Sequence, residues 1–296
     1  MAQHKALIIG CGYSGERLAA RLLKGGVAVS AVLRSDDRAR RLDAMGVRVL
    51  QHDLDAQLSP TEQLAPDTVV YYLAPPPRDG DTDTRLDQWL AAQHGTPARL
   101  VYTSTSGVYG DCGGRPVPES TPLNPGTARA VRRVAAERSV EAWAANNGTD
   151  WLVLRVAGIY GPGRLPIDSV ARGEPVIREA DAGPGNRIHV DDLVTAMLQA
   201  GTADFKNAAV NVADGNSYSG TWFRQKIAGF AGLPAPPEVS RETARETFSP
   251  MRYSFLAESR QLDVTRLLQE LKVELKWADQ SAGIEDSVRR TPRERS

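Results

Sequence analysis

Three glycines near the start of the chain have the types and spacing that bind a diphosphate. The segment GCGYSG places Gly10, Gly12 and Gly15 in G-x-G-x-x-G spacing, directly after the apolar run KALII and before a helical stretch. In that context the first glycine permits a tight turn, the second lets the main chain approach a pyrophosphate, and the third allows close helix–strand packing. Free N–H groups at the helix start then face the anion.

The pattern predicts a dinucleotide site, with a glycine turn that binds nothing as the alternative. The residues between the glycines that we expect to line it are Cys11, Tyr13 and Ser14.

The end of the second apolar run indicates which dinucleotide is bound. An acidic residue there would accept both ribose hydroxyls and favour NAD or FAD, but the chain has Arg34, followed by Ser35 and Arg38. A guanidinium pairs with a 2′-phosphate, whereas a carboxylate repels it. We therefore expect NADP(H). NAD remains the alternative, in which Asp36 or Asp37 takes the ribose and the arginines only begin a solvated helix.

Further cofactor contacts are expected where the following strands end. Asp53, in QHDLD, closes the third strand, where a side chain can meet the adenine edge; a turn-capping role is an equal alternative. The other expected contacts are Leu54, Leu73, Ala74, Pro75 and Thr103.

A cluster of hydroxyl residues marks the strand that should carry chemistry. The segment LVYTSTSGVYGD has four in succession, from Thr103 to Ser106. Because strand ends face the cofactor crevice in a doubly wound sheet, packing explains this cluster poorly.

Five motifs in order resemble the extended short-chain dehydrogenases/reductases, also called the NAD-dependent epimerase/dehydratase family. They are the glycine turn, YTSTSGVYGD, ESTPLNP, LRVAGIYGPGR and RIHVDDL, and the resemblance covers about residues 5 to 215. It implies that Thr105 hydrogen-bonds the reacting carbonyl or hydroxyl.

The acid–base pair of that family is absent. Counting back from Glu137, the resemblance places the Tyr and Lys of Tyr-x-x-x-Lys at positions held by Arg129 and Arg133. Arg133 can hold the nicotinamide ribose as the lysine does. Arg129 cannot replace the tyrosine, because a guanidinium keeps its proton near neutral pH. The pattern is closest to an atypical, YeeZ-like branch that also lacks the pair. An ordinary solvated helix face is the alternative for these arginines.

No sequence feature selects a replacement proton relay. The candidates are Tyr109, Tyr160 or a water held by Thr105. Gly158 stands where family members that act on nucleotide sugars usually carry Asn, which argues against such a substrate. We expect His189, in RIHVDD, to cap or pack and not to catalyse.

The elements that must position these residues form an α/β pattern. Apolar runs alternate with helical stretches over the first two hundred residues, which predicts a doubly wound parallel Rossmann-type sheet with a smaller C-terminal substrate lobe. We expect an NAD(P)-binding domain over residues 1–213, with a loop excursion to the substrate side over 161–185. Residues 214–296 form the small lobe and tail.

Composition excludes several classes of protein. Lys plus Arg and Asp plus Glu are both 36, so the net charge is zero, and no nucleic-acid partner is expected. Cys11 and Cys112 lack disulfide or zinc spacing, and no metal site is expected. No leader-like or membrane-spanning apolar run is present, so we expect a cytoplasmic protein without a membrane partner.

Two functions remain open. The first is an NAD(P)-dependent oxidoreductase or epimerase of the extended type, acting on a small-molecule carbonyl or alcohol with an atypical proton relay. The second is a catalytically silent NADP(H)-binding redox sensor or assembly factor, which explains the missing Tyr and Lys directly. Monomer and homodimer are equally compatible with the sequence.

Overall fold

Seven parallel strands form the central sheet of a computed structural model, which describes residues 5–56, 64–250, 252–253 and 258–292. Their order across the sheet is β11-β7-β5-β4-β1-β2-β3. Their bounds are β1 Lys5–Ile9, β2 Ala28–Leu33, β3 Arg48–Gln51, β4 Thr68–Tyr72, β5 Arg99–Thr105, β7 Asp150–Val156 and β11 Ala208–Val212. The chain runs outward from β1 to β3 and then returns to β4 on the other side of β1. The strand order therefore reverses between β1 and β4, which is where such sheets bind ligands.

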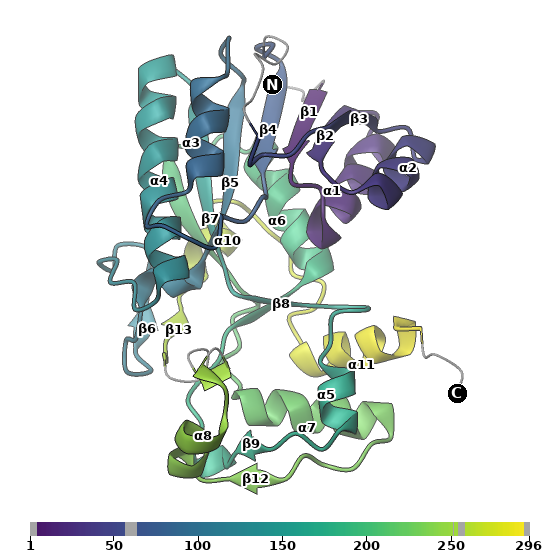
Figure 1. Cartoon of the computed structure of the whole chain (residues 1–296), viewed down its shortest axis with the longest axis vertical. Helices are drawn as coiled ribbons and strands as arrows, with labels where there is room; N and C mark the ends of the chain where they lie inside the picture. The colour runs from purple at the N-terminus through teal and green to yellow at the C-terminus, as the bar shows by residue number, and fades with distance from the viewer. Residues whose placement is uncertain (1–4, 57–63, 251, 254–257, 293–296) are drawn as a thin grey trace.

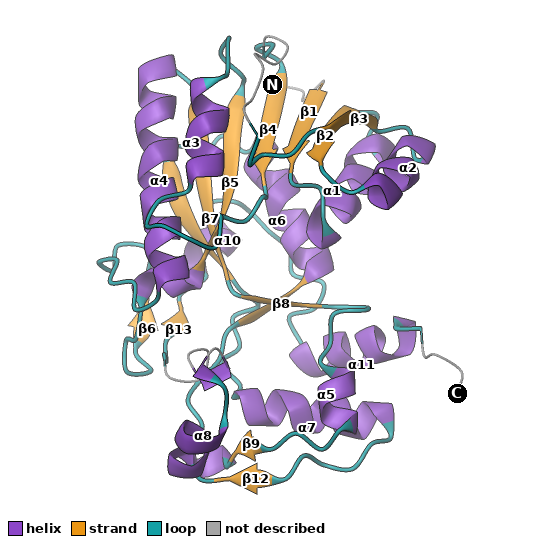
Figure 2. Ribbon diagram, in the orientation of Figure 1, coloured by secondary structure: helices purple, strands orange, loops and turns teal. Residues whose placement is uncertain are grey.

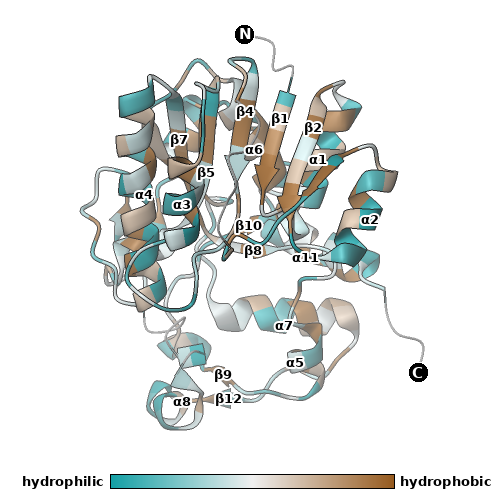
Figure 3. Cartoon of the chain, turned by 45° about the horizontal axis from the view of Figure 1, so that its top comes forward, coloured by the Kyte–Doolittle hydropathy of each residue, from teal (hydrophilic) through white to brown (hydrophobic). Residues whose placement is uncertain are grey.

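Helices cover both faces of the sheet (Figure 1). On one face lie α1 (Tyr13–Lys24), α2 (Asp36–Ala44) and α6 (Val190–Thr202), and on the other lie α3 (Thr84–Ala91) and α4 (Ala128–Asn147). Since both faces are covered, the inner strands are apolar throughout; all five residues of β4 are buried. Figure 3 shows these strands as the most hydrophobic part of the chain. The predicted doubly wound α/β class is confirmed.

A smaller group of elements lies beyond the carboxyl ends of the strands (Figure 2). Its helices are α5 (Ile167–Ala171), α7 (Gly220–Ala231), α8 (Arg241–Thr247) and α11 (Gln280–Arg290). Its strands β9 (Val176–Ile177) and β12 (Glu238–Val239) pair with each other. The lobe has its own apolar cluster, in which Phe223 and Ile227 of α7 pack with Ile284 of α11.

The chain crosses between the sheet and the lobe repeatedly. Strand β8 (Gly158–Tyr160) pairs with β10 (Arg187–His189), and β6 (Pro116–Val117) pairs with β13 (Gln261–Leu262). After β13, α10 (Thr265–Gln269) returns to the sheet and places Leu267 in its main apolar core. Two 3₁₀ turns, Ser106–Tyr109 and Glu179–Asp181, complete the described elements. No helix within the described ranges is long and apolar enough to cross a membrane.

Candidate active site

Two adjoining cavities form one groove along the carboxyl ends of the strands. The larger has a volume of about 540 Å³ and the smaller about 310 Å³, and both are lined by Gly10, Gly12 and Pro75. The groove therefore lies at the reversal of strand order. The structure brings the predicted glycine turn and the predicted hydroxyl strand to the same cavity, since Thr103 and Thr105 line the larger one.

Each glycine of the first turn meets a different spatial demand. Gly10 has φ +84°, and a Cβ built on it would lie 2.6 Å from the main chain of Ala74, so neither the conformation nor the space admits a side chain. A Cβ on Gly15 would lie 3.2 Å from the Cys11 sulfur, which reflects close packing of α1 on the sheet. A Cβ on Gly12 would meet no atom within 4 Å. The space beside Gly12 is thus open to a ligand.

The side chain of Tyr13 connects the glycine turn to the segment that contains Pro162. Its hydroxyl donates to the Pro162 carbonyl at 3.0 Å, and the guanidinium of Arg164 lies 5.1 Å from its ring centre. Arg164 and Ser14 line the larger cavity with it. Arg164 ends the LRVAGIYGPGR motif, but the sequence did not indicate that its side chain lies at the glycine turn.

Basic residues gather around the smaller cavity. Arg34 is 70% exposed and lies 3.6 Å from Asp53, whereas Arg38 donates to Glu16 at 2.7 Å. Arg85 of α3 pairs with Asp55 at 2.6 Å and also lines the cavity. The remaining expected residues of this cavity wall are Cys11, Ser35, Leu54 and Ala74, while Leu73 lines the larger cavity. Sequence reasoning did not find Arg85, because nothing in its local sequence marks it.

The hydroxyl strand divides its side chains between the two faces of the sheet. Thr105 accepts a hydrogen bond from the Gly107 N–H at 3.2 Å, and the Thr103 hydroxyl is buried without a partner among the described residues. Ser104 turns toward α4 and donates to Glu137. The alternation of a strand therefore leaves Thr103 and Thr105 on one face.

Helix α4 directs its arginines to different places. Thr127 caps the helix by accepting from the Ala130 N–H. Arg133 donates through Nη1 to the Tyr102 hydroxyl at 2.8 Å and to the Thr103 carbonyl at 2.9 Å. Arg129 and Arg133 line the larger cavity, whereas Arg132 is buried elsewhere and donates to the Gly80 carbonyl. Arg132 and Arg133 therefore make contacts inside the protein, whereas Arg129 is exposed at the edge of the cavity.

Tyr109, a candidate proton relay, is buried away from this cavity. Its hydroxyl donates to Asn211 at 2.8 Å and accepts from Arg155 at 2.9 Å, and it does not line the larger cavity. Burial raises the pKa of Tyr109 to about 12. Arg155 also pairs with the buried Glu137 at 2.8 Å. Tyr160 is 2% exposed and packs edge-on against His189, also outside the cavity lining.

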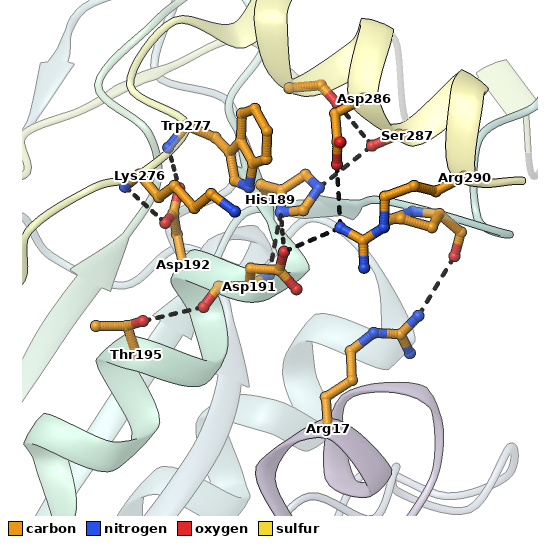
Figure 4. Close-up of polar contacts among 12 residues, drawn as sticks. Arg17, His189, Asp191, Asp192, Thr195, Lys276, Trp277, Asp286, Ser287 and Arg290 are labelled. Atoms are coloured by element: carbon orange, nitrogen blue, oxygen red, sulfur yellow. Dashed lines mark hydrogen bonds and ion pairs between the residues drawn. The ribbon is translucent and has the colours of Figure 1, made fainter. Parts of the chain in front are cut away.

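His189 joins α6 to the C-terminal helix (Figure 4). Its Nδ1 accepts from the Asp191 N–H at 3.1 Å, and its Nε2 lies 3.2 Å from the Ser287 hydroxyl, which donates to Gly283. Burial lowers the pKa of His189 to about 4, so the ring is neutral. Asp192 accepts the N–H groups of Lys276 and Trp277 at 2.9 Å each, and so holds a loop. The group positions the lobe and does not face the groove.

A further cavity of about 320 Å³ lies in the lobe. The charged residues that line it are Arg187, Arg224, Arg241, Arg252 and Glu258. Glu258 also lines the larger cavity of the groove, so it stands where the two meet. Within the described residues, no group of three or more His, Cys, Asp or Glu side chains has an arrangement that could hold a metal.

The doubly wound sheet, the glycine turn at its reversal point and the hydroxyl strand beside it define a dinucleotide-binding α/β protein of the dehydrogenase type. The comparisons agree: residues 6–213 match the model of the NAD dependent epimerase/dehydratase family, and the chain belongs to that family. The predicted resemblance is confirmed.

Three known proteins show the range of similarity. The chain is 32% identical over 217 residues to protein YeeZ of Escherichia coli K12, covering 66% of this chain and 73% of YeeZ. A structure of a functionally unknown conserved protein from Silicibacter pomeroyi is 30% identical, with a TM-score of 0.81 over 97% of this chain and 98% of that one. A UDP-glucuronic acid 4-epimerase from Bacillus cereus, in complex with NAD, has a TM-score of 0.73 at 16% identity over 97% and 98%. The similarity to the Bacillus cereus epimerase, at 16% identity, concerns the fold alone.

Proposed function

We propose that the chain binds NADP(H) along the groove and acts as an oxidoreductase or epimerase on a carbonyl or alcohol substrate. The observation that carries this proposal is that the glycine turn, Thr105 and Arg133 line one cavity. A pyridine nucleotide fits the residues present, since the space beside Gly12 is open and main-chain N–H groups begin α1 there. When bound, it supplies the carbon that accepts or gives up hydride.

The preference for NADP over NAD rests on the smaller cavity. Arg34 is exposed beside that cavity and only loosely paired with Asp53, so it is free to turn toward a 2′-phosphate. Arg38 lines the same cavity, where Glu16 holds its guanidinium in an ion pair. A guanidinium fork suits a phosphate. The structural neighbour from Bacillus cereus is in complex with NAD, so the proposed preference for NADP rests on these arginines alone.

Two side chains act directly on the bound molecules. Because the Thr105 oxygen accepts from the Gly107 N–H, its own proton is available for the substrate oxygen. Arg133 is fixed by Tyr102 and Thr103, and its remaining N–H groups hold the nicotinamide ribose.

The proton follows a route other than a tyrosine of the usual motif. Tyr109 and Tyr160 are buried outside the cavity lining, which leaves a water held by Thr105 as the relay. Gly158 lines the cavity where an asparagine would serve a nucleotide sugar. The substrate is therefore a small molecule of another class.

A catalytically silent NADP(H) sensor is the second candidate. The observation that favours it is the pair Arg129 and Arg133 in the cavity, where the family's Tyr and Lys would act. Such a protein would bind NADPH tightly without turnover.

Cofactor binding and hydride exchange separate the two functions. NADPH affinity is measured by fluorescence, and hydride exchange by isotope transfer between labelled NADPH and a panel of aldehydes, ketones and sugars. Exchange that Thr105→Ala lowers about a hundredfold, and that Thr105→Ser retains, supports the enzyme. Tight binding with no exchange on any substrate favours the sensor, and absence of NADPH and NADH binding refutes both.

A further inference from the structure

The proton relay of the proposed function needs a group that holds the proton. Water and the Thr105 hydroxyl pass a proton on without keeping it near neutral pH, so a titratable side chain must accept it. Among the described residues that line the large cavity, the ionisable side chains are Tyr13, four arginines and Glu258. The arginines keep their protons. The Tyr13 hydroxyl donates to the Pro162 carbonyl, and burial raises its pKa. Glu258 is therefore the one acceptor of a proton in this lining.

Glu258 is held at the cavity by one of its two carboxylate oxygens. Its side chain is 13% exposed, and its Oε2 lies 2.7 Å from Arg260 Nη2. Arg260 is fixed in turn, because it also donates to the Gly110 carbonyl. Within the described part of the chain, Glu258 Oε1 accepts no hydrogen bond. The carboxylate thus has a fixed position and a second oxygen available to a ligand.

A series of short contacts connects this second oxygen to the hydroxyl strand. A Cβ built on Gly126 would lie 2.9 Å from Glu258 Oε1, so the glycine lets the carboxylate reach the start of α4. A Cβ built on Gly107 would lie 3.8 Å from the Ala130 Cβ, in the first turn of α4, and 3.6 Å from Thr105 Oγ1. The carboxylate and the Thr105 hydroxyl therefore both lie near the first turn of α4, where the family's tyrosine would stand.

We propose that Glu258 is the general base and acid of the reaction, and that it exchanges the proton of the substrate oxygen through the water held by Thr105. The inference rests on the proposed function and deepens it. In alcohol oxidation the substrate O–H bond breaks, and its proton passes through the water to Glu258. The C–H bond breaks with its electron pair, which leaves as hydride for the oxidised nicotinamide, and the C=O bond forms. Carbonyl reduction reverses each transfer. Because the side chain is partly exposed, the carboxyl group then exchanges its proton with solvent.

The first test compares hydride exchange in variants of the full chain with benzaldehyde, cyclohexanone and glyceraldehyde, and with the corresponding alcohols. Glu258→Gln keeps an oxygen for Arg260 but takes up no proton, so kcat should fall about a hundredfold or more with NADP⁺ affinity unchanged. Glu246→Gln, the same change on an exposed part of α8 outside both cavities, should leave kcat unchanged. Formate added to Glu258→Ala should restore part of the rate, which a purely structural role would not allow.

Gly126→Ala displaces the carboxylate without removing it. The added methyl group would meet only the end of the Glu258 side chain, which can turn away. We therefore expect kcat to fall about tenfold or more, while urea unfolding stays close to that of the wild type.

Proton uptake provides a measurement that does not depend on turnover. In a complex with NADP⁺ and a carbonyl compound no hydride can move, and a hydrogen bond to the carbonyl oxygen favours the protonated carboxyl group. Calorimetry of cyclohexanone binding, in two buffers of different ionisation enthalpy at mildly acid pH, counts the protons. We expect uptake in the wild type and none in Glu258→Gln. The arginines of both cavities keep the same charge in the two proteins.

The outcomes separate this inference from the proposed function. Equal exchange rates in Glu258→Gln and Glu246→Gln overturn the inference alone, as does proton uptake that persists in Glu258→Gln or a Glu258→Ala protein that formate does not restore. Wild-type protein that binds NADP⁺ and exchanges hydride with no compound refutes the proposed enzyme, and the role of Glu258 with it.

Discussion

Replacing Gly12 by alanine should separate cofactor binding from stability. Gly12 has φ −98°, which other residues adopt, and an added Cβ meets nothing within 4 Å. The free energy of unfolding of Gly12→Ala should therefore stay within about 1 kcal/mol of the wild type. The new methyl group would stand in the space that the diphosphate needs, and would push it from the first N–H groups of α1.

The expected loss of affinity follows from those contacts. A hydrogen bond to a charged group contributes about 1.5–3 kcal/mol, so losing one raises the Kd for NADPH about tenfold to roughly 150-fold. Fluorescence titration measures the Kd, and urea unfolding measures the stability.

Gly10→Ala is the matched control, because its Cβ would lie 2.6 Å from the main chain of Ala74 at φ +84°. Strain and overpacking together should destabilise it by about 2–5 kcal/mol. Unchanged NADPH affinity in Gly12→Ala would refute the reasoning, since the open space would then not be the diphosphate site. A Gly10→Ala protein as stable as the wild type would refute the packing argument.

Three further changes test other parts of the structure. Arg34→Ala should weaken NADPH binding about tenfold and leave NADH nearly unchanged in parallel titrations, because only NADPH carries the 2′-phosphate; equal losses would reject this role. Glu137→Ala leaves the buried Arg155 unpaired and should lower the free energy of unfolding by about 3–5 kcal/mol in urea. The exposed Glu141→Ala on the same helix should change it by less than about 0.5 kcal/mol, and similar losses in both would contradict the ion-pair argument. The pKa of His189 is about 4 when folded against an ordinary 6.5, so the unfolded chain binds the proton first and stability falls as pH drops between these values, by about 3 kcal/mol. The curve of the free energy of unfolding against pH should lack this fall in His189→Gln. A variant curve parallel to that of the wild type would exclude His189 as its cause.

Local patterns were enough to predict the sheet and the first turn. The apolar runs predicted the strands because both sheet faces are covered, as the wholly buried β4 shows. The glycine spacing predicted a turn whose geometry depends on neighbouring atoms, since Gly10 needs its positive φ and Gly15 its closeness to Cys11. Such features follow from contacts near in sequence or from one adjacent strand.

The site residues that the sequence did not predict depend on contacts between segments far apart in the chain. Glu258 and Arg260 reach the cavity only because β13 pairs with β6, and Arg85 only because α3 returns beside Asp55. Tyr109 stands in a motif beside the hydroxyl strand, yet Asn211 and Arg155 take its hydroxyl inside the protein. The 3₁₀ turn that holds Tyr109 and its partners distant in the sequence set the direction of its side chain.

The return of α10 to the sheet has a consequence for how the molecule can move. Leu267, Leu271 and Val273 belong to the main apolar core of the sheet, although α8 before this segment and α11 after it belong to the smaller lobe. If the lobe moved as a rigid body, every segment that crosses between it and the sheet would have to bend together. Otherwise these three apolar side chains would leave the core and become exposed to water. Access to the groove therefore requires local rearrangement at its rim. A chain shortened at residue 213 would lack these three side chains in its core and should unfold less cooperatively.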